Sequence, residues 1–68
     1  MPLSARNHLK GTIEDIEIGN VVAHVTVRVG ADVIESVITR RSAEEMGLKK
    51  GDGVTAVVKA TEVMLSKP

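Results

Sequence analysis

The fold is decided by the stretch Val21-Val22-Ala23-His24-Val25-Thr26-Val27-Arg28-Val29. All of its odd-numbered residues are apolar, whereas three of its four even-numbered residues are polar. Alternation with a period of two, in a run rich in β-branched residues, is typical of a strand with one buried face. We therefore predict a strand over residues 21–29 whose odd-numbered side chains face the core.

The residues on both sides of this stretch predict two more strands. Gly19-Asn20 before it and Gly30-Ala31-Asp32 after it have the composition of tight turns, since Gly and Asn tolerate a positive φ. Residues 9–18 form the preceding strand and residues 33–39 the following one. In the preceding strand the apolar positions change from odd to even numbers at Glu14-Asp15, which predicts a β-bulge or a sharp bend there.

Beyond residue 39 the period of the pattern changes. Ser42 followed by Glu45 fits a capping box, with Ser42 as the N-cap of a short helix and Gly47 as its C-terminal stop. Alternation returns over residues 54–60 and 62–66, which predicts a fourth and a short fifth strand. Five strands with one short helix between the third and the fourth predict an all-β fold. We expect a five-stranded OB-like barrel that forms a single domain over residues 1–68.

The length of the chain, 68 residues, limits its stability as a monomer. Area scaling predicts a folded surface of roughly 4,100 Å², and apolar burial then contributes about 95 kcal/mol against an ordering cost of about 100 kcal/mol. Small domains usually gain stability from disulfides, metals or further subunits. The chain has no Cys, and its only imidazoles, His8 and His24, have no acidic cluster beside them. We therefore predict a homo-oligomer whose side chains ligate no metal ion directly.

The composition argues against several functions. Nine basic and nine acidic residues give zero net charge, and Phe, Tyr and Trp are absent. Modules that bind nucleic acid usually have a basic excess and aromatic side chains for base stacking, so no nucleic-acid partner is expected. The chain has no Cys nucleophile, catalytic His pattern or phosphate-binding glycine loop, so we do not expect an enzyme. No apolar run has the length of a signal peptide or a membrane span, and we expect a cytoplasmic protein without a membrane partner.

Candidate anion-binding residues lie near both ends of the chain. Ser4 and Arg6 point to the same side of an extended segment, so a hydroxyl and a guanidinium could approach one oxyanion together. Lys59 lies beside Ala60 near the end of the fourth predicted strand, and Thr39 immediately precedes the helix. By spacing alone, each of these residues fits a solvated surface position or a local helix cap better than a ligand.

Three motifs follow one another along the chain. They are Ser4-Ala5-Arg6-Asn7 with Leu9-Lys10-Gly11, then Ile38-Thr39 with Ser42-Ala43-Glu44-Glu45-Met46-Gly47-Leu48, then Ala56-Val57-Val58-Lys59-Ala60-Thr61-Glu62-Val63-Met64. In this order they resemble the molbindins, the small Mop-type molybdate-binding proteins, and the resemblance covers residues 3–65. It implies an OB-like barrel, assembled as a hexamer from three dimers. It also implies binding and storage of molybdate or tungstate in the cytoplasm without an organic cofactor.

The resemblance further implies which residues bind the anion. The main oxyanion sites of the family lie between subunits, and their residues correspond here to Ser4, Arg6, Thr39, Lys59 and Ala60. A second kind of site, near the threefold axis, falls on the turn Gly19-Asn20-Val21, with His8 as a further candidate. Molybdate at neutral pH is a dianion without a proton. A selective site therefore presents hydroxyl, N–H and cationic donors and no carboxylate, as the main set does.

Two alternative functions remain open at this point. The chain could be a structural oligomerisation module without a ligand, or an OB module that binds nucleic acid. Bound molybdenum or tungsten would exclude the first, and salt-dependent binding of a single strand would support the second. Arg40-Arg41 is more basic than the family pattern. The pair could strengthen the attraction of an anion or be ordinary surface charge, and neither residue is counted among the ligands.

Overall fold

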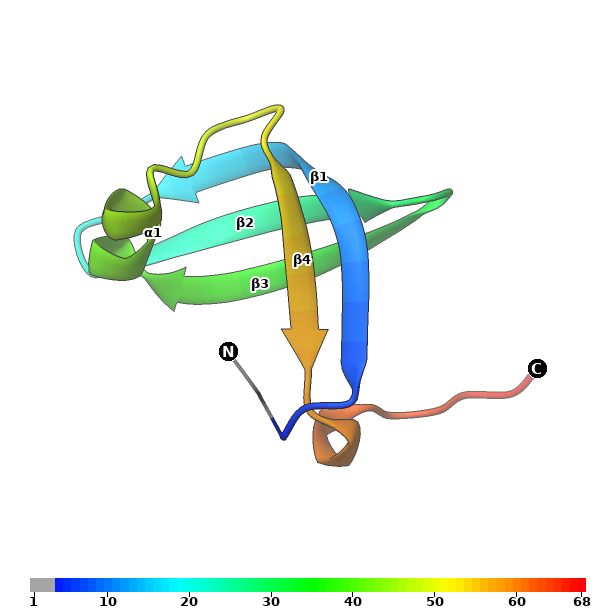
Figure 1. Ribbon diagram of the computed structural model, residues 1–68. Coiled ribbons are helices and arrows are strands. Elements are labelled where there is room, and N and C mark those ends of the chain that lie inside the picture. The colour runs from blue at the N-terminus through cyan, green and yellow to red at the C-terminus, as the bar shows by residue number, and fades with distance from the viewer. Residues whose placement is uncertain (1–3) are drawn as a thin grey trace.

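The computed structural model describes residues 4–68 as a strongly bent antiparallel sheet with two short helices (Figure 1). The elements along the chain are β1 (Asn7–Ile18), β2 (Val22–Val29), β3 (Asp32–Thr39), α1 (Arg40–Met46), β4 (Gly53–Val58) and the 3₁₀ helix η1 (Ala60–Glu62). The strand order is β3-β2-β1-β4, so β3 and β4 are the two edges of the sheet. The all-β, OB-like architecture with one short helix between the third and fourth strands is confirmed.

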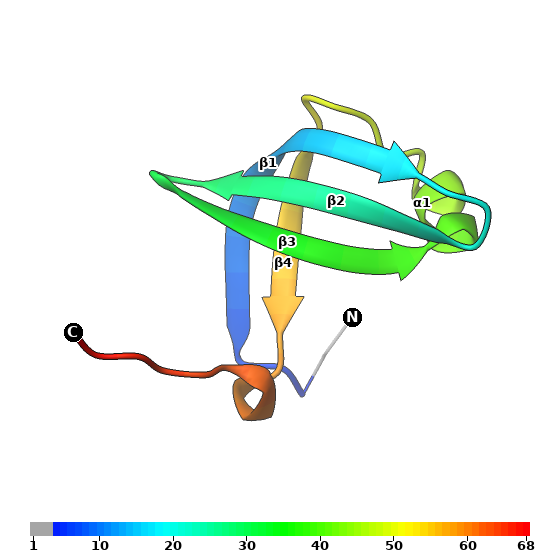
Figure 2. The same ribbon diagram turned by 180° about the vertical axis from the view of Figure 1, so that it is seen from behind.

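The long strand β1 makes the barrel possible because it serves two neighbours. Its first half pairs with β4 and its second half with β2. Ile13 pairs with Val27 and Asp15 with Thr26, which leaves Glu14 as the extra residue of a bulge. The predicted bulge is thus confirmed, and β1 bends across the sheet near it (Figure 2). At Gly11 a Cβ atom would collide with the carbonyl oxygen of Arg28, so only glycine allows this close approach to β2.

The odd-numbered side chains of β2 form the centre of the core, as predicted. The buried side chains of the described chain are those of Ile13, Ala23, Val25, Val27 and Ala43. Val21 differs from the prediction, because it precedes β2 and is 74% exposed. Its carbonyl accepts a hydrogen bond from the N–H of Arg40 (2.8 Å), which holds this residue in the turn between β1 and β2.

The helix α1 begins directly after β3, earlier than predicted. Thr39 is its N-cap, and the Thr39 hydroxyl accepts a hydrogen bond from the N–H of Ser42 (3.0 Å). The predicted capping box with Ser42 as N-cap is therefore wrong, since Ser42 lies inside the helix. Glu45 does not reach back to the helix start but forms an ion pair with Arg41 (3.4 Å). The predicted stop at Gly47 is confirmed by its left-handed conformation (φ 60°).

The fifth predicted strand, residues 62–66, is not formed. β4 ends at Val58, and the chain turns through η1 into a segment that runs away from the sheet (Figure 1). Met64 and Leu65 are each 93% exposed. An alternating sequence forms a strand only where a free edge lies within reach, and η1 directs these residues away from both edges of their own sheet. No helix within residues 4–68 has the length and apolar composition needed to cross a membrane.

Candidate functional site

Four of the predicted site residues meet where β1 begins and β4 ends. The pair formed by Asn7 and Val58 is the last one of the β1–β4 ladder. The residues just before it on one strand and just after it on the other therefore emerge side by side, as both views of the ribbon show (Figures 1 and 2). These residues, which we call the β1–β4 end, are Ser4, Arg6, Lys59 and Ala60, and all four are exposed.

The β1–β4 end is positively charged. Arg6 and Lys59 form no ion pair with any carboxylate of residues 4–68, whereas Arg28, Arg40 and Arg41 each have a glutamate partner. Lys59 is also the N-cap of η1, where its carbonyl accepts the N–H of Glu62 (2.9 Å), so its ammonium group is not used in the cap. A hydroxyl and two cations without an ion-pair partner, on adjoining exposed segments, are suited to an anion.

Two side chains outside the predicted main ligand set hold this end together. The Asn7 amide Nδ2 donates to the carbonyl oxygen of Val58 (3.1 Å). The His8 ring Nε2 donates to the carbonyl oxygen of Ala5 (3.0 Å). Asn7 stood inside the first motif, but its partner lies 51 residues away along the sequence, so no local signal pointed to the contact.

Thr39 does not join the other four main-site residues within one chain. It lies at the end of β3, where it pairs with Val22 and caps α1. Its hydroxyl also donates to the Ser42 hydroxyl (2.9 Å). Figure 1 shows α1 at the left of the molecule and η1 well apart from it at the bottom, so a single chain supplies the predicted set in two separate parts.

The predicted second site is also divided. Gly19, Asn20 and Val21 form the exposed turn between β1 and β2, closed by a hydrogen bond from the Gly19 N–H to the Val22 carbonyl (2.8 Å). This turn lies beside α1. His8 lies near the other end of β1 and is bonded to Ala5. The structure thus brings Thr39, rather than His8, close to the turn.

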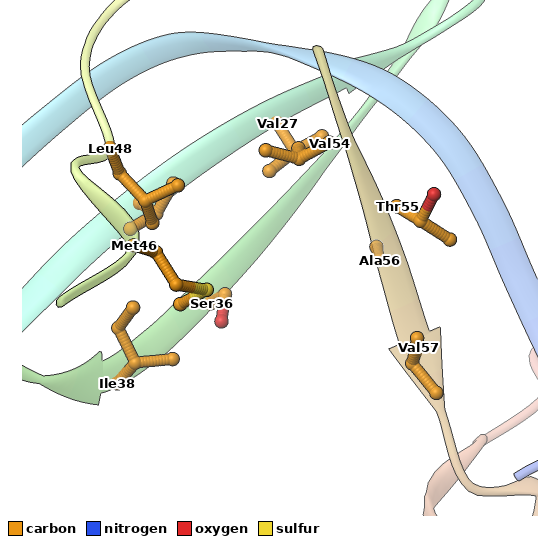
Figure 3. Close-up of a pocket in the computed structure, with 10 residues that line it drawn as sticks. Val27, Ser36, Ile38, Met46, Leu48, Val54, Thr55, Ala56 and Val57 are labelled. Atoms are coloured by element: carbon orange, nitrogen blue, oxygen red, sulfur yellow. The ribbon is translucent and has the colours of Figure 1, made fainter. Parts of the chain in front are cut away.

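An apolar cavity of about 260 Å³ opens between the two sheet edges (Figure 3). Its walls come from β2, β3 and β4 and from the end of α1, and the close-up shows Met46 between Leu48 and Ile38. Such a lining offers a dianion almost no donors, so this cavity is not an oxyanion site. Within residues 4–68, no group of three or more His, Cys, Asp or Glu residues could hold a metal ion. The lining residues are Val25, Val27, Ser36, Ile38, Met46, Leu48, Val54, Thr55, Ala56 and Val57.

Comparison with known proteins places this arrangement in a family. The TOBE domain model matches residues 3–65. The chain belongs to the TOBE domain family. Molybdenum-pterin-binding protein 2 of Clostridium pasteurianum is 46% identical to this TOBE domain over 66 residues, which are 96% of this chain and 97% of that protein. The sequence resemblance to the Mop-type proteins is therefore confirmed.

Solved structures agree with this TOBE domain in fold. A molybdate-binding protein from Sporomusa ovata superposes with a TM-score of 0.93 at 37% identity, over 98% of this chain and all of that one. The cytoplasmic molybdate-binding protein ModG, solved with molybdate bound, gives a TM-score of 0.92 at 43% identity. The match covers the whole of this chain and 49% of ModG.

Proposed function

We propose that this protein binds molybdate, and tungstate in the same way, at sites formed between copies of the chain. The observation that carries the proposal is the β1–β4 end, where Arg6 and Lys59 lie beside Ser4 without a carboxylate partner in residues 4–68. The names of the relatives support the choice of anion, since one binds molybdenum-pterin and two bind molybdate.

The chemistry of the main set fits a fully deprotonated tetrahedral dianion. Hydroxyl, ammonium and guanidinium groups donate hydrogen bonds, and those from charged donors are the stronger ones. Monohydrogen phosphate carries a proton that needs an acceptor, and Ser4, Arg6, Thr39, Lys59 and Ala60 include no carboxylate to accept it. Sulfate has the same hydrogen-bonding surface as molybdate, so the site must reject it by its smaller size.

A site between subunits is supported by the separation of Thr39 from the other four residues. The chain exposes 5583 Å² of surface, against roughly 4,100 Å² expected for a folded monomer of this size. The excess exceeds the roughly 800 Å² that each partner buries in a standard interface. Much of it is apolar, including Val63, Met64 and Leu65. We propose a homo-oligomer, a hexamer of three dimers, in which a second copy brings Thr39 and its helix cap to the β1–β4 end.

The proposed role is storage of the oxyanion rather than catalysis. The zero net charge and the lack of aromatic residues do not favour a nucleic-acid partner. A cytoplasmic location is supported by the cytoplasmic relative ModG. Because the bound dianion removes the repulsion between cations that face each other across the subunit contact, anion binding should stabilise the oligomer.

Calorimetric titration of the purified protein with molybdate, tungstate, sulfate and phosphate tests the proposal. We expect tight, saturable binding of the first two anions and much weaker binding of the others. At a hundredfold excess of molybdate over Kd, the free energy of unfolding should rise by about 2.7 kcal/mol, visible as a higher Tm. A protein that stays monomeric in light scattering and binds neither molybdate nor tungstate would overturn the proposal.

A further inference from the structure

Two consecutive residues at the start of β1, Asn7 and His8, are bonded to the backbone of the β1–β4 end. Neither belongs to the main ligand set, yet each contacts a residue adjacent to a member of it. We propose that Asn7 and His8 are positioning residues of the oxyanion site, which set its affinity without touching the anion. This inference rests on the proposed function of the site.

Asn7 connects the two strands immediately beside their cations. Arg6 precedes Asn7 in the chain, and Lys59 follows Val58, whose carbonyl accepts the Asn7 amide (3.1 Å). Asn7 is half-buried, so this bond is partly shielded from water. Within residues 4–68 it is the one hydrogen bond that joins a side chain to the backbone of a distant segment. The bond therefore reinforces the pairing of Asn7 with Val58, which sets how far apart the two cationic residues lie.

The charges at this end explain why such a connection is needed. Arg6 and Lys59 carry the same sign, and no carboxylate of residues 4–68 is ion-paired with either. Without an anion their repulsion favours separation of the two strand ends, which lie at the border of the ladder. The Asn7 bond opposes this separation, so the site keeps its spacing while it is empty. A preorganised site loses less free energy when the anion binds.

His8 acts on the segment before the strand. Successive side chains of a strand point to opposite faces, and His8, next to the inward Asn7, is exposed. Its Nε2 bonds the carbonyl of Ala5, the residue between Ser4 and Arg6 (3.0 Å). This bond restrains the backbone between the residues that carry the hydroxyl and the guanidinium. It ties His8 to the segment that carries two members of the main set, Ser4 and Arg6.

A double-mutant cycle on the full-length protein tests the inference. In the variants Asn7→Leu and His8→Leu the side chain keeps similar bulk but loses its donor. We expect the molybdate Kd to rise about fivefold for Asn7→Leu and about threefold for His8→Leu, as for the loss of one neutral hydrogen bond. Thr55→Val, a loss of one hydroxyl from the same β1–β4 ladder, is the matched control and should leave Kd unchanged.

The cycle is completed in an Arg6→Ala background, which separates positioning from general destabilisation. If Asn7 and His8 act through Arg6, their substitution costs little further affinity once the guanidinium is gone. Equal losses in both backgrounds, or no loss relative to Thr55→Val, would overturn the inference. If Asn7→Leu does not fold, the exposed His8→Leu decides by the same two comparisons. Failure of the wild-type protein to bind molybdate would instead refute the proposed function.

Discussion

Two regions of this small protein use their arginines in opposite ways. At the β1–β4 end, Arg6 has no carboxylate partner within residues 4–68. On the rest of the surface, Arg28, Arg40 and Arg41 are each paired with a glutamate, as is His24 with Glu35 (2.8 Å). We call this second region the paired surface.

The comparison shows that the position of compensating charges, and not their number, marks the candidate site. The chain has as many acidic as basic residues, so its net charge reveals no anion site. Four of the nine carboxylates form the ion pairs of the paired surface, and within residues 4–68 none is ion-paired with Arg6 or Lys59. Lysines are less informative than arginines, since none of the five in the chain forms an ion pair in the described residues. Lys59 differs from the other lysines only in its position, directly after the last residue of β4.

The largest expected effect contrasts one arginine from each region. Arg6→Ala removes a charged donor of several hydrogen bonds, and the molybdate Kd should rise about thirtyfold in calorimetric titrations. Arg28→Ala removes an arginine of the paired surface that is bonded to Glu14 (2.8 Å), and it should change Kd less than about twofold. Similar losses for both variants would show that the anion responds to overall charge rather than to this end of the sheet.

A second contrast compares two exposed lysines that differ in their distance from the β1–β4 end. Lys59→Gln keeps a polar side chain but removes the charge beside Arg6, and we expect Kd to rise about tenfold. Lys50→Gln changes an equally exposed lysine in the loop after α1 and serves as the control. A comparable weakening by Lys50→Gln, measured by the same titration, would contradict the assignment of Lys59.

Local signals predicted much of the fold. The alternation in residues 21–29 identified β2 and its buried face, and the change of phase at Glu14-Asp15 identified the bulge. Both features depend on neighbours in sequence. The prediction of a fifth strand was wrong because alternation at residues 62–66 does not show whether a free sheet edge lies near them. The Ser42 cap was wrong because Thr39 already occupies that role where β3 meets α1.

The site was less predictable than the fold. The motifs pointed to Ser4, Arg6 and Lys59, but nothing in their spacing shows that residues 4–6 meet residues 59–60. That proximity follows from the pairing of Asn7 with Val58 across 51 positions. The bond from Asn7 to Val58 and the pairing of Arg28 with Glu14 likewise depend on which segments the sheet brings together. The other contacts are local, because His8 bonds a residue three positions away and the remaining two arginines pair within one turn of α1. Thr39 remains apart in one chain, and only an assembly of chains could reunite it with the rest.

A smaller effect is expected from the neutral member of the β1–β4 end. Ser4→Ala removes one hydroxyl donor, so the molybdate Kd should rise about fivefold, clearly less than for Arg6→Ala. Ser66→Ala, an exposed serine of the C-terminal segment, is the control and should have no effect on Kd. If the Ser4 and Arg6 variants lost equal affinity in titration calorimetry, the charged donor would not dominate the site.

The smallest expected effect concerns the paired surface. Glu14 holds Arg28 with two contacts (2.8 and 2.9 Å), and its hydrogen bond and then its negative charge raise the pKa of Arg28. A cation whose folded-state pKa is raised contributes stability at every lower pH and loses it only as strongly alkaline solution removes the proton. The Glu14→Gln variant should therefore show a Tm slightly below the wild type, by the same amount from pH 7 to pH 9.

The same variant should bind molybdate with a Kd within about twofold of the wild type, since an exposed pair on another part of the sheet has little influence through salt solution. Thermal unfolding followed by circular dichroism and a titration at each pH provide both readouts. A Tm difference that grows between pH 7 and pH 9 would show that another group titrates with this pair. A large rise in Kd would show that the paired surface contributes to anion binding, and the contrast between the two regions would no longer locate the site.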